Sequence, residues 1–79
     1  MKLDEILSLI LKSIVDSPND VQVASEEDDK YGILYKVQVA PVDRGIIIGK
    51  EGKTAQAIKY LVMVISKRKR QKVAIKFDF

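Results

Sequence analysis

The sequence predicts an α+β domain of two layers, in which a three-stranded sheet is covered on one face by three helices. Two patterns support this prediction: apolar residues recur at helical spacing in two long segments, and they alternate with polar residues in three shorter ones. The predicted order is α-β-β-α-α-β, which is typical of helices packed against one sheet. The 79 residues form one predicted domain (1–79), near the lower size limit for a self-sufficient core.

The first helix is predicted over about residues 2–16. One face of it carries apolar residues at the spacing i, i+3, i+4, i+7, namely Leu3, Ile6, Leu7, Ile10, Leu11 and Ile14. Asp4 and Glu5 stand where the positive end of the helix dipole favours acids. Pro18 ends the helix, because the residue before a proline is pushed out of the helical region.

Two strands are predicted next, at about residues 20–26 and 31–40, because apolar and polar residues alternate there. We expect them to pair antiparallel through a short hairpin, with the acidic run 26–30 as its charged turn. The sheet face that carries Lys36 and Gln38 is expected to be polar and solvated.

A short helix is predicted over residues 42–48, after Pro41, and a long helix from residue 52 or 53 to about residue 67. The predicted buried face of the long helix carries Ala55, Ile58, Leu61, Val62 and Ile65. A third strand is predicted over residues 73–79, where apolar and polar residues alternate again.

Two residue types that carry much of enzyme chemistry are missing from the chain. There is no Cys and no His, which excludes disulfides, the usual zinc ligands and the commonest general base. No catalytic residue, metal site or cofactor is therefore predicted. No apolar run has the length of a membrane span, and Asp4 and Glu5 interrupt any signal pattern. We expect a cytoplasmic protein without membrane contact.

Charge is divided unequally between the two halves of the chain. Residues 1–43 hold 4 Lys/Arg and 9 Asp/Glu, a net charge of −5, whereas residues 44–79 hold 10 Lys/Arg and 2 Asp/Glu, a net charge of +8. A basic half of this kind is typical of nucleic-acid binding. The alternative is a solvated face with no ligand.

The predicted short and long helices are joined by Gly49-Lys50-Glu51-Gly52, a GxxG loop. Glycine allows positive φ and brings bare backbone close to a partner. The first amides of the following helix lack intrahelical acceptors and suit a phosphate. Position 47 is Ile47 rather than glycine, which excludes both a P-loop and a dinucleotide fingerprint. A nucleic-acid backbone therefore fits the loop better than a nucleotide cofactor, and the alternative is a plain turn between helices.

A second basic segment follows the long helix. Residues 67–72 read Lys-Arg-Lys-Arg-Gln-Lys. This basic connector is either a second phosphate-binding segment or a solubilising turn, and the sequence favours neither.

Residues around the loop carry a resemblance to a known family: Ala40-Pro41, Asp43, Gly45, the run Ile47-Ile48-Gly49-Lys50-Glu51-Gly52-Lys53-Thr54-Ala55, and Ala57-Ile58. In this element order they resemble the type II KH domain. Essentially the whole chain is similar to the small bacterial single-domain KH RNA-binding proteins of the KhpA family.

The resemblance implies that the GxxG loop clamps the backbone of about four single-stranded nucleotides. Carried onto this sequence, the RNA-binding residues are Gly49, Lys50, Glu51, Gly52, Lys53 and Thr54 of the clamp, Arg44 and Lys59 at flanking phosphates, Ile48 in an apolar groove, and Lys36 and Gln38 at base edges if their strand forms the far wall. Ile47, Ala55 and Ile58 line that groove or the core beneath it. Glu51 opposes phosphate binding, and Tyr60 is the one aromatic residue expected near the loop, so base stacking is expected to contribute little.

The resemblance also implies partners and a process. The implied partners are single-stranded RNA and either a second copy of the chain or a larger KH-containing RNA-binding protein. The implied process is RNA chaperoning or post-transcriptional regulation, linked to cell shape, cell-wall biogenesis and division.

Two other hypotheses stay open. Exposed Met63 or Val64 would favour a dimerisation module whose RNA contact is incidental. An enzyme is disfavoured, because Asp43, Glu51 and Thr54 supply no pair of base and nucleophile.

Overall fold

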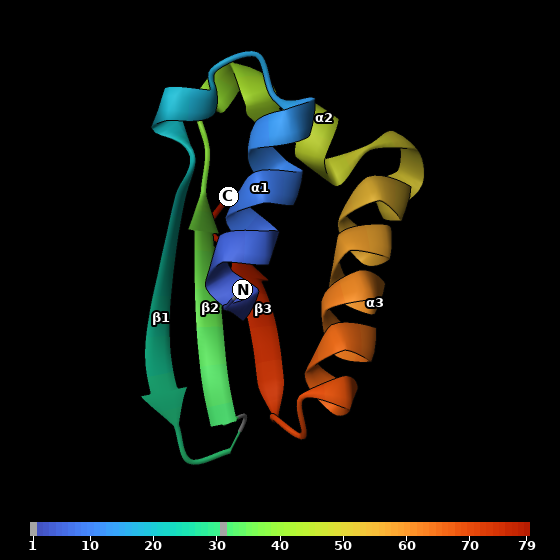
Figure 1. The fold of residues 1–79 in the computed structure, drawn as a ribbon. Helices are drawn as coiled ribbons and strands as arrows, with labels where there is room; N and C mark the ends of the chain where they lie inside the picture. Colours follow the sequence, from blue (N-terminus) through green and yellow to red (C-terminus); the bar gives the residue numbers. More distant parts are fainter. Residues whose placement is uncertain (1, 31) are drawn as a thin grey trace.

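The computed structural model describes residues 2–30 and 32–79 and confirms the predicted order of helices and strands. The elements are α1 (Leu3–Ile14), β1 (Gln22–Asp28), β2 (Gly32–Gln38), α2 (Arg44–Ile48), α3 (Lys53–Arg68) and β3 (Val73–Phe77) (Figure 1). Short 3-10 turns precede β1, α2 and α3, at Pro18–Asp20, Pro41–Asp43 and Lys50–Gly52. The predicted second strand begins at Tyr31, which lies outside the described residues.

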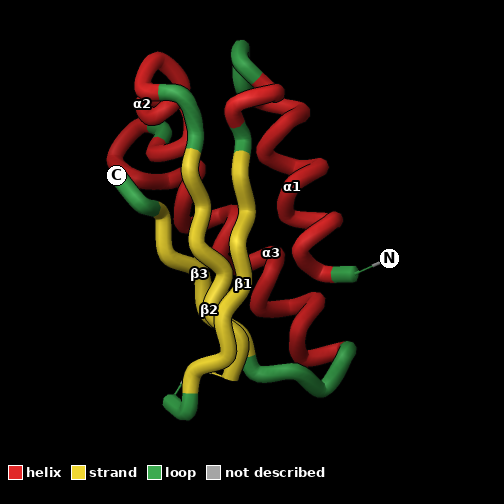
Figure 2. The backbone as a smooth tube through the Cα atoms, turned by 90° about the vertical axis from the view of Figure 1, so that its left-hand side faces the viewer, coloured by secondary structure: helices red, strands yellow, loops and turns green. Residues whose placement is uncertain are grey.

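The sheet has the strand order β1-β2-β3. β1 and β2 pair antiparallel, with Gln22 opposite Gln38, whereas β2 and β3 pair parallel, with Val37 opposite Phe77. β2 is therefore the central strand, and β3 is the edge strand on the side of α3. In the side view, α1 and the lower part of α3 lie to one side of the strands, and α2 lies at their upper end, near the C-terminus (Figure 2).

The core lies between the sheet and the helices. Its buried members come from every layer: Leu3, Leu7, Leu11, Val21, Tyr35, Val37, Val39, Ile47, Ile58 and Val62. Successive residues of a strand point to opposite faces. Tyr35 and Val37 of β2 therefore face the core, while Lys36 and Gln38 face the open side.

The acidic run after the first predicted strand needs a correction. The sequence predicts a turn there, but Glu26, Glu27 and Asp28 continue β1 and pair with residues 32–34 of β2. β1 is an edge strand, and charged side chains are well tolerated on such strands. The hairpin is consequently tighter than the predicted one.

The buried face of α3 also differs from its prediction at one position. Ile58 and Val62 are buried as expected, but Leu61 is 48% exposed. The next buried residue at helical spacing is Ser66, whose hydroxyl donates a hydrogen bond to the Met63 carbonyl at 2.7 Å. Because a serine can be buried when its hydroxyl is satisfied in this way, the face of α3 that contacts the sheet is rotated away from Leu61.

Candidate nucleic-acid interface

The GxxG loop joins α2 to α3 in a backbone conformation that glycine favours. Gly49 has φ 73° and ψ 176°, and Gly52 has φ 75° and ψ 10°. Between them Glu51 is also left-handed, with φ 58° and ψ 27°. The Gly49 amide donates to the Gly45 carbonyl at 2.9 Å, and the Gly52 amide donates to the Gly49 carbonyl at 3.2 Å. The loop is thus a defined turn that separates the two helices.

The two glycines are needed for different reasons. A Cβ atom at Gly49 would overlap the Thr54 side chain and lie 2.8 Å from the Thr54 nitrogen. Gly49 is therefore required by close packing, and Thr54 is the residue that packs against it. A Cβ atom at Gly52 would meet nothing within 4 Å, so only the positive φ requires glycine there. Gly52 presents open backbone at the start of α3.

The start of α3 is suited to an anion. Among the described residues no side chain caps this helix start, and the first amides of a helix carry the positive end of its dipole. The exposed Lys50 and Lys53 flank it. The Glu51 carboxylate lies 3.9 Å from the Lys53 ammonium, but both side chains are more than 70% exposed, so their attraction is weak. The loop therefore keeps a positive field despite its acid.

Arg44 and Lys59, the two predicted flanking cations, both reach toward the end of β3. The Arg44 guanidinium carbon lies 5.8 Å from the centre of the Phe79 ring, and the Lys59 ammonium lies 5.6 Å from the centre of the Phe77 ring. Both distances are typical of cation–π contacts. The structure thus brings these two cations together with an aromatic pair.

An apolar groove runs between α3 and β3. It has a volume of about 270 Å³ and is lined by Lys59, Val62, Met63, Val73, Ala74 and Ile75. Ile48, at the end of α2, is 44% exposed and lies directly before the loop, while Ile47 and Ile58 belong to the core beneath. The far wall of the groove is therefore β3.

Lys36 and Gln38 do not join this groove, because β2 is the central strand and both side chains face the open side of the sheet. Lys36 forms an ion pair with Glu26. This hydrogen-bonded carboxylate raises the pKa of Lys36 above its ordinary value. The Gln38 side-chain amide donates to Asp78 at 2.8 Å. Their predicted base contacts required β2 to form the far wall of the groove, and β3 forms that wall instead.

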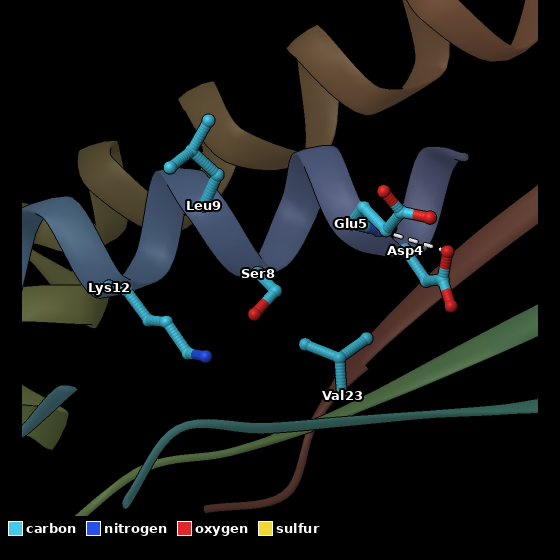
Figure 3. Close-up of a pocket in the computed structure, with 6 residues that line it drawn as sticks. All are labelled: Asp4, Glu5, Ser8, Leu9, Lys12 and Val23. Carbon is cyan, nitrogen blue, oxygen red and sulfur yellow. Dashed lines mark hydrogen bonds between the residues drawn. The ribbon is translucent and has the colours of Figure 1, made fainter. Parts of the chain in front are cut away.

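A second pocket, of about 490 Å³, lies between α1 and β1 (Figure 3). Its lining residues are Asp4, Glu5, Ser8, Leu9, Lys12 and Val23. With two acids and one lysine, its lining is net acidic and does not favour phosphate, and it includes no residue of the glycine loop. Among the described residues there is also no cluster of acids that could hold a metal ion.

Sequence reasoning missed the structural role of Asp43, for which it weighs only a catalytic one. Its carboxylate is fully buried and accepts hydrogen bonds from the amides of Asp16 and Ser17, each at 3.0 Å. These contacts fasten the end of α1 to the start of α2. Nothing in the spacing of Asp43 indicates partners more than twenty residues earlier. The place of Phe79 beside Arg44 was missed for the same reason.

The mixed three-stranded sheet, the order α-β-β-α-α-β and the GxxG loop between the last two helices define a KH domain of type II. Comparison with known families agrees, since the KH-domain model of KhpA and KhpB matches residues 4–77. The chain belongs to this family.

Curated relatives cover nearly the whole chain. RNA-binding protein KhpA of Listeria monocytogenes is 36% identical over 73 residues, which is 92% of this chain and 95% of that protein. The KhpA of Clostridium acetobutylicum is 37% identical over 71 residues, 90% and 93% of the two chains. The KhpA of Streptomyces coelicolor is 44% identical over 66 residues, 84% and 82% of the two chains. No helix in the described part of this chain is long and apolar enough to cross a membrane.

Proposed function

We propose that this protein is a non-enzymatic RNA-binding protein that clamps the backbone of single-stranded RNA with its GxxG loop. The observation that carries the proposal is the open side of Gly52, where a Cβ atom would meet nothing within 4 Å and the start of α3 is uncapped by the described residues. A phosphate bound there accepts hydrogen bonds from backbone amides and is attracted by Lys50 and Lys53. The relatives named RNA-binding protein support RNA as the ligand.

The neighbouring residues extend the clamp into a binding surface. Thr54 packs against Gly49 and holds the loop in shape. Bases of the clamped strand lie along the groove between α3 and β3, and the exposed Ile48, directly before the loop, offers a further apolar contact. Such apolar contacts select bases weakly, so the domain binds many single strands with modest affinity. This behaviour suits an RNA chaperone or post-transcriptional regulator of the cytoplasm.

The sharpest test replaces Gly52 by Asp or by Asn. Both side chains tolerate the left-handed backbone and have nearly the same size, and the space around Gly52 is open, so the pair differs mainly in charge. We expect Gly52→Asp to bind labelled single-stranded RNA at least about tenfold more weakly than Gly52→Asn, because a carboxylate then occupies the phosphate position. Fluorescence anisotropy measures the affinity, and circular dichroism confirms the fold.

Salt provides a second measure of the same proposal. The logarithm of the affinity is expected to fall linearly with the logarithm of salt concentration, by about 0.7 for each phosphate neutralised on a single strand. A folded Gly52→Asp variant that binds as well as Gly52→Asn, or an affinity that does not change with salt, would contradict the clamp.

A second candidate function, pairing with another KH-containing chain, is favoured by the outer side of α3. Tyr60, Leu61 and Val64 are 62%, 48% and 38% exposed and follow helical spacing. An apolar stripe of this kind is a face for another helix. It lies away from the groove side that holds Lys59 and Met63, so a homodimer or a pair with a larger KH protein leaves the groove open.

Sedimentation of Leu61→Glu tests this pairing. Leu9→Glu on α1 is the matched control, because Leu9 is similarly exposed at 56%. We expect dimers for the wild type and for Leu9→Glu, and monomers for Leu61→Glu. A wild type that stays monomeric at high concentration would remove the pairing function while leaving the RNA clamp untouched.

A further inference from the structure

The end of β3 carries an aromatic pair that the clamp does not use. The rings of Phe77 and Phe79 lie 5.8 Å apart between centres and are tilted by 57°. Phe77 is half-buried against the core, whereas Phe79 is 37% exposed. An aromatic ring with an accessible face is the group on which an unpaired nucleobase stacks.

The position of this pair relative to the loop follows from the two cations that touch it. Arg44 is the first residue of α2, and Lys59 is the seventh residue of α3. Each is therefore less than two helical turns from the GxxG loop, on one of its two flanking helices. Since Arg44 reaches Phe79 and Lys59 reaches Phe77, the aromatic pair lies within reach of a side chain from each helix that flanks the loop.

Phe79 is held in place by its neighbours. The Asp78 amide donates to the Val37 carbonyl at 2.9 Å, and the Asp78 carboxylate accepts from Gln38 at 2.8 Å. The preceding residue is thus fixed through both its main chain and its side chain. This order lowers the entropy cost of presenting the ring to a ligand.

We propose that Phe79, together with the Arg44 guanidinium beside it, is a stacking platform for one unpaired base of the RNA strand held by the loop. The proposal rests on the RNA-binding function above and names a contact that the clamp does not supply. An aromatic ring and a guanidinium plane both stack on bases, and Arg44 also neutralises the phosphate attached to the stacked nucleotide. Stacking tolerates all four bases, so the platform adds affinity more than sequence selectivity.

Substitution of Phe79 separates this contact from the clamp. We expect Phe79→Leu, which keeps apolar bulk, to bind single-stranded oligoadenylate about fivefold or more weakly than the wild type. An abasic sugar–phosphate chain of the same length should bind to both proteins equally, because it has no base to stack. Thermal unfolding of Phe79→Leu reports any loss of packing against Phe77.

A tryptophan reporter gives an independent readout. The chain contains no Trp, so Phe79→Trp introduces a single tryptophan that can be excited selectively, and a stacked base is expected to quench its emission. Tyr60→Trp, on the outer side of α3 and 62% exposed, is the control that should not be quenched. Quenching at position 79 by oligoadenylate but not by the abasic chain supports the platform.

The binding measurements distinguish a failure of the stacking platform from a failure of the GxxG clamp. If Phe79→Leu binds oligoadenylate like the wild type while Gly52→Asp loses binding, the platform is wrong and the clamp stands. If the wild type binds neither oligoadenylate nor the abasic chain at low salt, both proposals fall. Equal weakening of Phe79→Leu on both ligands would assign Phe79 to packing and would also overturn the platform.

Discussion

The two ends of α3 are both basic, yet their backbones offer opposite chemistry. At its start, Lys50 and Lys53 stand beside an open glycine and helix amides. At its end, the basic connector stands beside helix carbonyls, which carry the negative end of the dipole. Three of those carbonyls accept amides of residues 69–71, at 2.9–3.1 Å. Lysines and arginines make both ends of α3 positive, but only its start has helix amides without intrahelical acceptors, which can donate hydrogen bonds to a phosphate.

The helix also keeps these two regions apart. Its 16 residues place its ends about 24 Å apart at a rise of about 1.5 Å per residue. The proposed clamp, which would hold about four nucleotides, therefore lies at one end of α3 only. We therefore expect the connector to attract nucleic acid by its charge alone, without a phosphate-binding site of its own.

The largest expected effect comes from destroying the shape of the clamp without changing its charge. Gly49→Ala forces a Cβ atom into the space of Thr54, in a backbone region that is essentially restricted to glycine. We expect a loss of stability on the order of 1–3 kcal/mol and at least about tenfold weaker RNA binding. Thermal unfolding and anisotropy measure the two effects.

Gly45→Ala is the matched control for this change. A Cβ atom at Gly45 meets nothing within 4 Å, and the residue lies inside α2. Alanine there should leave RNA binding unchanged and raise stability by about 0.5–1 kcal/mol. Equal losses in both variants would mean that the loop geometry is not what matters.

A smaller effect is expected when the connector is neutralised. Lys67→Gln with Arg68→Gln should weaken single-stranded RNA, single-stranded DNA and duplex RNA by similar factors of a few-fold at low salt, because charge alone attracts all three. The salt slope should fall by less than the about 0.7 per contact that a lost phosphate contact removes from it. A selective loss of single-stranded RNA would instead give the connector a binding site and break the contrast between the two ends.

The smallest effect concerns the acid inside the clamp. Glu51→Gln removes a negative charge beside the phosphate position and releases Lys53 from its weak ion pair. We expect RNA affinity to rise by about twofold at low salt and the gain to vanish at high salt, where exposed charges are screened. A fall in affinity would show that Glu51 contributes to recognition.

Local patterns were sufficient to predict the elements of the fold and the position of the loop. The alternation of Tyr35 and Val37 with Lys36 indicated the correct faces of β2, and the glycines marked the turn between α2 and α3. Strand order was not encoded locally. Lys36 and Gln38 were predicted at base edges on the condition that their strand forms the far wall of the groove. Only the parallel pairing of β2 with β3 shows that β3, and not β2, is the edge strand at this wall.

Contacts between residues far apart in the sequence could not be predicted from local patterns either. Leu61 fits the apolar period of α3 as well as Val62 does, and only the packing of Ser66 shows which side meets the sheet. The approach of Arg44 to Phe79 joins residues from α2 and from beyond β3. Periodicity reports which residues share a face of one element, but not which element lies opposite.

The buried carboxylate of Asp43 limits how this RNA clamp can be reused by evolution or by engineering. In the described part of the chain, its two oxygens accept hydrogen bonds from the amides of Asp16 and Ser17, which follow α1. A fragment that starts at β1 would keep the complete loop and both of its helices, yet it would bury an anion without donors, at a cost of several kcal/mol. A transplanted loop would therefore also need the segment that follows α1, which has no part in the proposed RNA contact.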